Sequence, residues 1–186
     1  MRDHCFFPMP ELETPRLLLR RLVRSDTDDL FAYARDPEVA RHVLWEAHQT
    51  RADSRWYIRQ QRRCYRDGEP ASLAMELKES GRMIGTIGWM EYAPEHNLAE
   101  IGYSLSREYW NRGLMTEAVM AVTDYSFREM GLHRLQAMVE TDNPASARVL
   151  VKCGYRQEGL LRGRVCNKGH YSDVLLFALL REELLR

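Results

Sequence analysis

The feature that most constrains this chain is a strand–helix–strand run between Ala99 and Glu140. The apolar pattern predicts a strand over Ala99–Leu105, an amphipathic helix over Leu114–Met130 and a second strand over Arg134–Glu140. Parallel strands need a crossover connection of this kind, usually a helix. The run therefore predicts a β-α-β crossover within a mixed α/β domain.

A basic loop with one glycine leads into the crossover helix, where residues 109–116 read Tyr-Trp-Asn-Arg-Gly-Leu-Met-Thr. The first turn of a helix leaves backbone N–H groups without intrahelical acceptors and carries a partial positive charge. Such a helix start suits an anion, including a pyrophosphate. Gly113 alone would fit an ordinary helix start, but the strand before it and the Asn143-x-x-Ser146 segment, 30 residues beyond it, favour the anion site.

The rest of the chain predicts a mostly antiparallel mixed sheet flanked by helices, in a single domain over residues 1–186. Capping residues favour helices from Ser25 to Ala34 and from Thr50 or Asp53 to Tyr65. The other expected elements are strands over Glu13–Leu22, Ala71–Leu77, Met83–Tyr92, Tyr155–Leu161 and Tyr171–Leu179, and short helices over Glu38–Val43 and Pro144–Cys153. Gly131 is the expected C-cap of the crossover helix, and Gly85 and Gly88 suggest a close backbone approach or a bulge.

Composition narrows the class of protein. Basic and acidic residues both number 27, so the formal net charge is zero and no global field attracts nucleic acid or a membrane, although a local patch stays open. No segment approaches the about 20 apolar residues that span a bilayer, and Cys5–Pro10 is too short for a signal-peptide core. Scattered cysteines and histidines predict reduced thiols and no metal. We expect a cytoplasmic protein.

Residues 99–155 together resemble the acyl-CoA site of the GNAT superfamily of N-acetyltransferases. The resemblance is carried by Tyr-Trp-x-x-Gly at 109–113, Thr-Glu-Ala at 116–118, Asn143-x-x-Ser146 and the Gly-Tyr pair at 154–155. The opening Thr14-x-Arg16 segment is similar to the RimJ/RimL-type branch, which acetylates protein N-termini. The resemblance implies a GNAT fold and direct acetyl transfer from acetyl-CoA to an amine. Dimers are common among similar proteins.

The resemblance also implies where acetyl-CoA binds. The diphosphate would lie against the backbone of Asn111, Arg112, Gly113, Leu114, Met115 and Thr116, with Arg107 and Arg112 as cationic partners. The pantetheine arm would pair with the strand Ile101–Leu105, including Ile101, Tyr103 and Leu105, like an added strand. This requires the strand to part from its neighbour. For each arginine, an ordinary surface charge is the alternative.

In the same resemblance, Asn143 lies beside the pantetheine and Ser146 lies near the thioester sulfur. The Ser146 hydroxyl is then the expected donor to the leaving thiolate. Asn143 followed by proline is also an ordinary helix start, and the two roles are compatible. Many GNAT enzymes carry a tyrosine acid seven residues after this asparagine. Here that position is Leu150, which puts a tyrosine acid in doubt and shifts the weight to Ser146.

The residues leave the general base open. Glu100 begins the central strand and is the first candidate, acting through a water, with a surface carboxylate as the alternative. Glu140 is the next, although we expect it to face solvent. Candidates for the acceptor groove are His170, Tyr171, Asp173, Trp45, Trp56 and Tyr57, the aromatic ones fitting the core at least as well. Cys153 is expected to be a buried packing residue.

Three functions remain open on the sequence. An α-amine has a pKa near 8 and needs no strong base, so the weak base signal favours acetylation of a protein or peptide N-terminus. Acetylation of a small amine, such as a polyamine or an aminoglycoside, would want an acidic groove, which Asp26, Asp28 and Asp29 could supply. A non-catalytic CoA-binding sensor is the third, favoured only by Leu150.

Overall fold

A computed structural model describes residues 6–184 of the chain. The strands are β1 (Leu12–Glu13), β2 (Leu17–Arg20), β3 (Ser72–Leu77), β4 (Arg82–Ala93), β5 (Leu98–Leu105), β6 (Arg134–Glu140), β7 (Arg156–Asn167) and β8 (His170–Leu180). The helices are α1 (Thr27–Ala34), α2 (Pro37–Ala40), α3 (Arg51–Asp67), α4 (Leu114–Arg128), α5 (Pro144–Lys152) and α6 (Arg181–Leu184), with 3-10 turns η1 (Arg24–Asp26), η2 (Pro94–His96) and η3 (Arg107–Tyr109).

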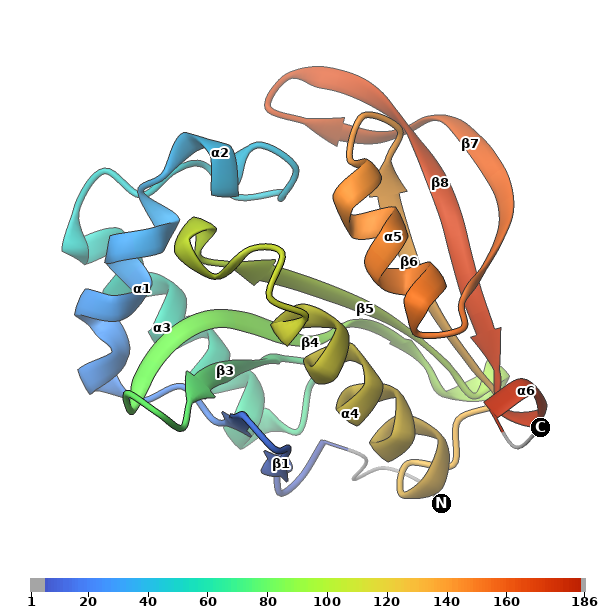
Figure 1. Cartoon of the computed structure of the whole chain (residues 1–186), viewed down its shortest axis with the longest axis horizontal. Helices are drawn as coiled ribbons and strands as arrows, with labels where there is room; N and C mark the ends of the chain where they lie inside the picture. Colours follow the sequence, from blue (N-terminus) through green and yellow to red (C-terminus); the bar gives the residue numbers. More distant parts are fainter. Residues whose placement is uncertain (1–5, 185–186) are drawn as a thin grey trace.

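The eight strands form one sheet in the order β1-β2-β3-β4-β5-β6-β8-β7. All pairs are antiparallel except β5 and β6, which the α4 crossover joins in parallel. Figure 1 shows α1 and α3 on one face of the sheet and α4 and α5 on the other. The predicted mixed, mostly antiparallel sheet flanked by helices is confirmed. Among residues 6–184, no helix combines the length and apolar character needed to cross a membrane.

The sheet has two halves, β1 to β5 and β6 to β8, and they are joined through a short parallel pairing of β5 with β6. Only Leu98–Glu100 of β5 align with Arg134–Gln136 of β6. Beyond Glu100 and Gln136 the two strands continue to Leu105 and Glu140 without pairing with each other, while β5 stays paired with β4 and β6 with β8. We call the space between them the β5–β6 gap, and the candidate site is built around it.

The core fixes both helical layers to the sheet. Trp89 of β4 is fully buried, and its indole nitrogen Nε1 donates a hydrogen bond of 2.9 Å to Ser126 Oγ of α4. Gly88 and Gly85 allow close backbone approach, since a Cβ atom at Gly88 would clash with the Ala71 carbonyl oxygen and one at Gly85 with that of Ser104. The predicted close approach is therefore confirmed at both glycines.

Several predicted boundaries near the N-terminus were wrong. The strand expected over Glu13–Leu22 is broken into β1 and β2 by a turn at Pro15, whose ring nitrogen cannot donate to a sheet ladder. Helix α1 is preceded by Asp26 rather than capped by Ser25. The Asp26 carboxylate accepts two hydrogen bonds from Arg20 (2.8 and 2.9 Å) and one from the Val23 N–H (2.8 Å), which explains the extra 3-10 turn.

Other boundaries differ by smaller amounts. Helix α2 is shorter and earlier than expected, since Asp36 accepts from Glu38 N and Pro37 occupies the first turn. Helix α4 ends at Arg128 with Glu129 as its C-cap, so Gly131 follows in a left-handed conformation (φ 67°) but is not itself the cap. Strands β7 and β8 extend to a tight turn at residues 168–169. By contrast, Thr50, one of the two expected caps of α3, is confirmed as its N-cap, and the other candidate, Asp53, completes a capping box with it.

Candidate functional site

The loop into α4 is held in an unusual backbone path. Asn111 and Gly113 both adopt positive φ angles, 60° and 74°. The Trp110 indole nitrogen donates to the Leu105 carbonyl oxygen at 2.8 Å and anchors the loop on β5. The first hydrogen bond of α4 runs from Glu117 N to the Gly113 carbonyl oxygen. The backbone N–H groups of residues 114–116 therefore precede the first helical bond, as in any helix start.

The side chains of this loop divide into buried and exposed groups. Leu114 and Met115 are buried, so only their backbone groups can meet a ligand, and Thr116 is half-buried. Arg107 and Arg112 are exposed, and no ion pair involves either of them within residues 6–184. The Arg112 guanidinium lies over the Tyr109 ring, 5.3 Å from its centroid. Two positive charges thus stand uncompensated at the start of α4.

A second set of contacts pins the N-terminal segment to this helix start. Both Thr14 Oγ1 (2.6 Å) and Arg16 N (2.8 Å) donate to Glu117 Oε1, and Arg16 Nε donates to Glu117 Oε2 at 2.7 Å. The other end of the Arg16 guanidinium donates to the Arg112 carbonyl oxygen at 2.9 Å. Although burial opposes ionisation, these hydrogen bonds lower the pKa of Glu117. Arg16 therefore neutralises the acidic side chain in the first turn of α4.

This contact joins two segments that are about a hundred residues apart in the sequence, Thr14-x-Arg16 and Thr116-Glu117-Ala118. The sequence signal for it is Glu117, because an acidic residue at a helix start that is expected to bind an anion calls for a nearby cation. Arg16 meets that need from the turn before β2.

Two hydroxyl groups meet on one face of the β5–β6 gap. Tyr103 of β5 and Ser146 of α5 place their hydroxyl oxygens 2.8 Å apart. Ser146 is held in turn by Asn143, whose Oδ1 accepts from Ser146 N at 3.2 Å and caps α5. Burial raises the pKa of Tyr103 well above its ordinary value, so its phenol stays neutral and can donate. Ile101 and Leu105 lie two positions before and after Tyr103, so they share its face of β5, and both are buried.

Leu150 takes no part in this hydroxyl pair. Its side chain is fully buried in the apolar core. The tyrosine hydroxyl next to Ser146 comes instead from Tyr103, on the strand across the gap. Cys153, at the end of α5, is buried as expected.

Glu100 lies where the two strands part, on the opposite face of the sheet from Tyr103. Side chains alternate along a strand, so positions 100 and 103 point to opposite faces. Glu100 is only 9% exposed, and its Oε2 accepts a hydrogen bond of 3.2 Å from Gln136 Nε2. Burial raises its pKa, and the nearby Glu91 adds to the rise. The gap is therefore flanked by a carboxyl group on one face and a hydroxyl pair on the other.

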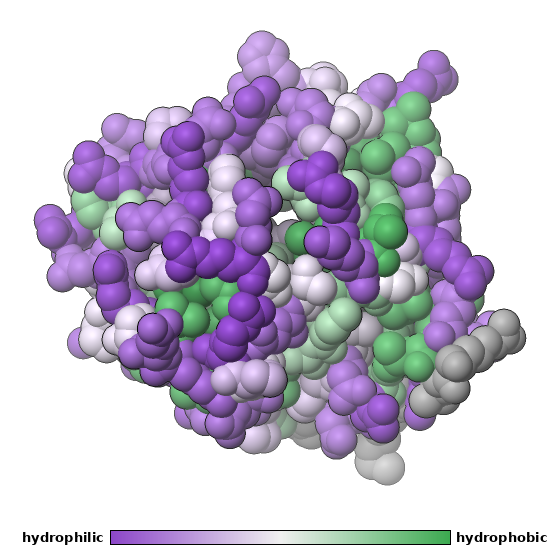
Figure 2. Space-filling model, viewed as in Figure 1, coloured by the Kyte–Doolittle hydropathy of each residue, from purple (hydrophilic) through white to green (hydrophobic). Residues whose placement is uncertain are grey.

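A bulge shapes the same part of the sheet. The register of β4 against β5 shifts between Trp89 and Glu91, which leaves Met90 as the extra residue. A Cβ atom on Gly102 would come within 2.8 Å of Met90 Cγ, so the glycine leaves room for the methionine side chain. Bulges of this kind are frequent beside active sites. In the space-filling view, the surface is hollowed between the start of α4 and α5 (Figure 2).

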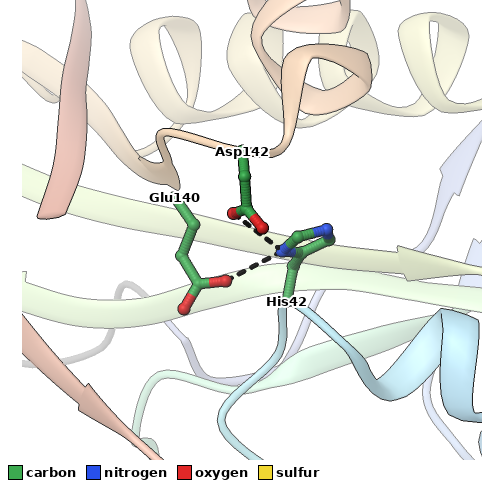
Figure 3. A group of neighbouring side chains, drawn as sticks. All are labelled: His42, Glu140 and Asp142. Atoms are coloured by element: carbon green, nitrogen blue, oxygen red, sulfur yellow. Dashed lines mark hydrogen bonds and ion pairs between the residues drawn. The ribbon is translucent and has the colours of Figure 1, made fainter. Parts of the chain in front are cut away.

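A polar cluster that the sequence did not reveal lies at the C-terminal end of β6. His42 Nδ1 lies 2.8 Å from Glu140 Oε2 and 3.5 Å from Asp142 Oδ1 (Figure 3). Asn167 Nδ2 donates to Glu140 Oε1 at 3.1 Å, and Lys168 donates to the Ala40 carbonyl oxygen. We call these contacts the clasp, because they join the segment after α2 to β6 and to the β7–β8 hairpin.

The position of Glu140 corrects an expectation. Its side chain is only 13% exposed, rather than facing solvent. Burial opposes its charge, but hydrogen bonds from His42 and Asn167 outweigh burial and lower its pKa. The ligand atoms of His42, Glu140 and Asp142 lie within 4.8 Å of one another, a set that suits a metal. However, Arg41 pairs with Asp142 at 3.5 Å, so protein groups already occupy all four carboxylate oxygens.

The remaining acceptor candidates are spread apart. Tyr171 is 79% exposed on the β7–β8 hairpin, and Asp173 accepts a hydrogen bond from Gly163 N within that hairpin at 2.7 Å. Trp45 and Tyr57 pack against the core, which is the alternative that the sequence left open. Trp56 is 57% exposed on α3.

Comparison with known proteins identifies the family. Residues 16–156 match the model of the acetyltransferase (GNAT) domain. The chain is 35% identical over 175 residues to the uncharacterized N-acetyltransferase p20 of Bacillus licheniformis, covering 94% of this chain and 98% of that protein.

Solved structures agree with that match. An acetyltransferase of the GNAT family from Bacillus anthracis is 28% identical, with a TM-score of 0.83 over 93% of this chain and 99% of that one. A RimL ribosomal alpha-N-protein acetyltransferase in complex with coenzyme A shares the fold, with a TM-score of 0.81 at 20% identity over 92% of this chain and 98% of its own. Because the family model spans most of the chain, this protein belongs to the GNAT family of N-acetyltransferases.

Proposed function

We propose that this enzyme transfers the acetyl group of acetyl-CoA to the N-terminal α-amine of a protein or peptide. The observation that carries the proposal is the β5–β6 gap, with the hydroxyls of Tyr103 and Ser146 on one face and the Glu100 carboxyl group on the other. A thioester lying in the gap would have a hydrogen-bond donor near its sulfur and a proton acceptor on the side from which an amine arrives.

The start of α4 fits the diphosphate of the coenzyme. Backbone N–H groups of residues 114–116 precede the first helical bond, and Arg107 and Arg112 are not neutralised by any ion pair among the described residues. The edge of β5 from Ile101 to Leu105 has no strand partner on the β6 side, which suits the amide groups of a pantetheine arm. Acetyl-CoA supplies the acetyl group as a thioester with a thiolate leaving group.

The chemistry is a direct transfer. The amine nitrogen attacks the thioester carbonyl carbon, the C–N bond forms, and the C–S bond breaks with its electron pair staying on sulfur. The nitrogen gives up one proton, which Glu100 accepts through a water; its raised pKa makes it a stronger base than a surface carboxylate. Because burial raises the pKa of Tyr103, the Tyr103–Ser146 pair stabilises the thiolate by hydrogen bonding, and solvent supplies the proton that yields free CoA.

Two features favour an α-amine acceptor. An α-amine with a pKa near 8 is partly neutral at cellular pH, so one carboxylate acting through water is sufficient. The three aspartates that could supply an acidic groove for a small polycation are also each paired with an arginine. Asp26 is bound by Arg20, Asp28 by Arg51 and Asp29 by Arg82.

The test is the release of free CoA from acetyl-CoA, measured with a library of N-terminal peptides beside a panel of small amines. We expect release with a subset of peptides, and a much lower rate for Ser146→Ala than for the control Ser25→Ala, which changes an exposed serine. Release with small amines alone would overturn the acceptor assignment. CoA binding without release for any acceptor would overturn the transfer itself.

A further inference from the structure

The exposed face of α3 carries a concentration of positive charge that acetyl transfer does not use. Six of the 17 residues of α3 are arginines, and all six are exposed. A cavity of about 360 Å³ is lined entirely by arginine side chains, namely Arg24, Arg59, Arg62, Arg63 and Arg66. Because the whole chain has a formal net charge of zero, this is a local feature rather than a consequence of composition.

Most of that charge is uncompensated. Asp67 lies 3.3 Å from Arg63 and 3.1 Å from Arg66, and so balances one charge between two arginines. Within residues 6–184, no ion pair or side-chain hydrogen bond involves the guanidinium groups of Arg24, Arg59 or Arg62. Like charges gathered around one hollow repel each other, and an anion in the hollow would relieve that repulsion.

An exposed aromatic ring adjoins the arginines. Trp56 is 57% exposed, and it precedes Arg59 by three positions and Arg63 by seven, which places all three on one strip of the helix. Aromatic rings beside a basic groove are how proteins bind single strands, because every base can stack on a ring while the groove follows the phosphates. The strip from Arg59 to Arg66 is about 10 Å long, room for about two successive phosphates of an extended single strand.

This surface is separate from the proposed coenzyme site. Helix α3 packs on the face of the sheet opposite α4, whose start is the proposed diphosphate site (Figure 1). The arginine side chains and the exposed Trp56 ring together offer partners for phosphate and for a base, which favours a single-stranded polyanion over a membrane.

We propose that Arg24, Arg59, Arg62, Arg63, Arg66 and Trp56 form a binding surface for single-stranded nucleic acid. The cavity takes the phosphates, and Trp56 stacks on a base. The residues read phosphate and ring, which RNA and DNA share.

The experiment is fluorescence anisotropy of labelled twelve-nucleotide oligouridine and oligothymidine with the full chain, from about 50 to 200 mM salt. We expect binding that weakens as salt rises, with a slope of log K against log salt of about −1.4 for about two neutralised phosphates. Binding of either oligonucleotide supports the proposal, and the difference between them shows whether RNA or DNA is preferred.

Variants assign the binding to this surface. Arg59→Glu with Arg62→Glu is expected to weaken binding at least tenfold at low salt and to flatten the salt slope. Trp56→Ala should weaken binding about tenfold and leave the slope unchanged. Arg128→Glu is the charge-matched control for a single Arg62→Glu change, because Arg128 is exposed on α4 and its ion pair among the described residues is with Asp124.

Four results would overturn the proposal. They are no anisotropy change for either oligonucleotide at low salt, equal losses for Arg62→Glu and Arg128→Glu, displacement of the oligonucleotide by free CoA, and sedimentation with phosphatidylserine vesicles in the absence of oligonucleotide binding. The last would assign the surface to a membrane. Each readout is independent of acetyl transfer.

Discussion

At the scale of single residues, the protein has a tyrosine hydroxyl at its proposed thiolate site although the expected helical tyrosine is missing. Leu150 fills that position and is fully buried. Tyr103 reaches Ser146 from the facing strand instead. The pair is partly buried and aligned on the proposed thiolate, so removing either hydroxyl is expected to affect the reaction more than binding.

We expect Ser146→Ala and Tyr103→Phe each to lower kcat by about 10- to 100-fold, with a smaller change in KM for acetyl-CoA, because the hydrogen bond to the thiolate develops only in the transition state. Steady-state kinetics measures both constants. Tyr155→Phe is the matched control, since it removes a buried tyrosine hydroxyl that lies 2.9 Å from Thr123 Oγ1 and outside the proposed site. Equal losses for Tyr103→Phe and Tyr155→Phe would mean a structural effect only.

The proposed role of Glu100 as the base predicts how the rate of acetyl transfer depends on pH. A base must be ionised to accept a proton, so the rate should fall as pH drops through the pKa of Glu100. Burial raises that pKa, which moves the acid limb of the profile above the ordinary range of a glutamate. Glu100→Gln should lower kcat and remove the part of the acid limb that comes from Glu100, leaving the part that comes from protonation of the acceptor amine. A variant with the acid limb intact would show that another group accepts the proton.

At the scale of elements, the start of α4 depends on a segment that lies about a hundred residues earlier in the chain. Arg16 bridges Glu117 and the carbonyl oxygen of Arg112, and so fixes both the helix and the loop before it. Without the bridge, the ionised Glu117 would face the incoming diphosphate alone.

Arg16→Ala is therefore expected to raise KM for acetyl-CoA several-fold while leaving KM for the acceptor nearly unchanged, and to reduce the free energy of unfolding by about 1 kcal/mol. Kinetics and urea denaturation measure the two effects. Arg21→Ala, an exposed arginine on the same segment, should change neither. A proportional rise in both KM values would point to general distortion.

Local patterns predicted the elements, and tertiary contacts decided what the patterns could not. The crossover helix follows from its apolar period, and the α3 cap from Thr50 and Asp53. Ser25 is a suitable cap by residue type, but Asp26 precedes α1 instead, because its carboxylate is held by the Arg20 side chain and the Val23 N–H. Tyr103 and Ser146 were both named, but their contact requires the β5–β6 gap. His42 and Glu140 are 98 residues apart, and no local signal joins them.

At the scale of the whole molecule, the clasp is a link between the two halves of the sheet that does not run through the strands. The halves share only three aligned residue pairs at β5 and β6. At the other end of β6, His42 and Lys168 connect the N-terminal helices to Glu140 and the β7–β8 hairpin. The clasp thus joins the N-terminal helices to the end of β6 that has no pairing with β5.

Glu140→Gln should lower the free energy of unfolding at pH 7 by about 1–3 kcal/mol, because hydrogen bonds to a charged group are lost. The folded pKa of Glu140 is lowered, so its stabilisation is fully present above the unfolded pKa and disappears as pH falls through the folded value. Urea denaturation of both proteins at neutral and acid pH measures this. A stability difference that persists at acid pH would exclude the charge as its source, and His96→Ala, at an exposed histidine, is the control.

The β5–β6 gap also affects how the protein behaves without its coenzyme. From Ile101 to Leu105 the backbone edge facing β6 has no strand partner, so this eight-stranded sheet has an unpaired strand edge in its interior, whereas most sheets have such edges only at their outer strands. Unpaired edges of this kind recruit foreign strands and promote aggregation. Coenzyme A in the gap would cover the edge as an added strand does. Purified protein is thus expected to tolerate concentration and storage better with CoA present, a benefit quite apart from catalysis.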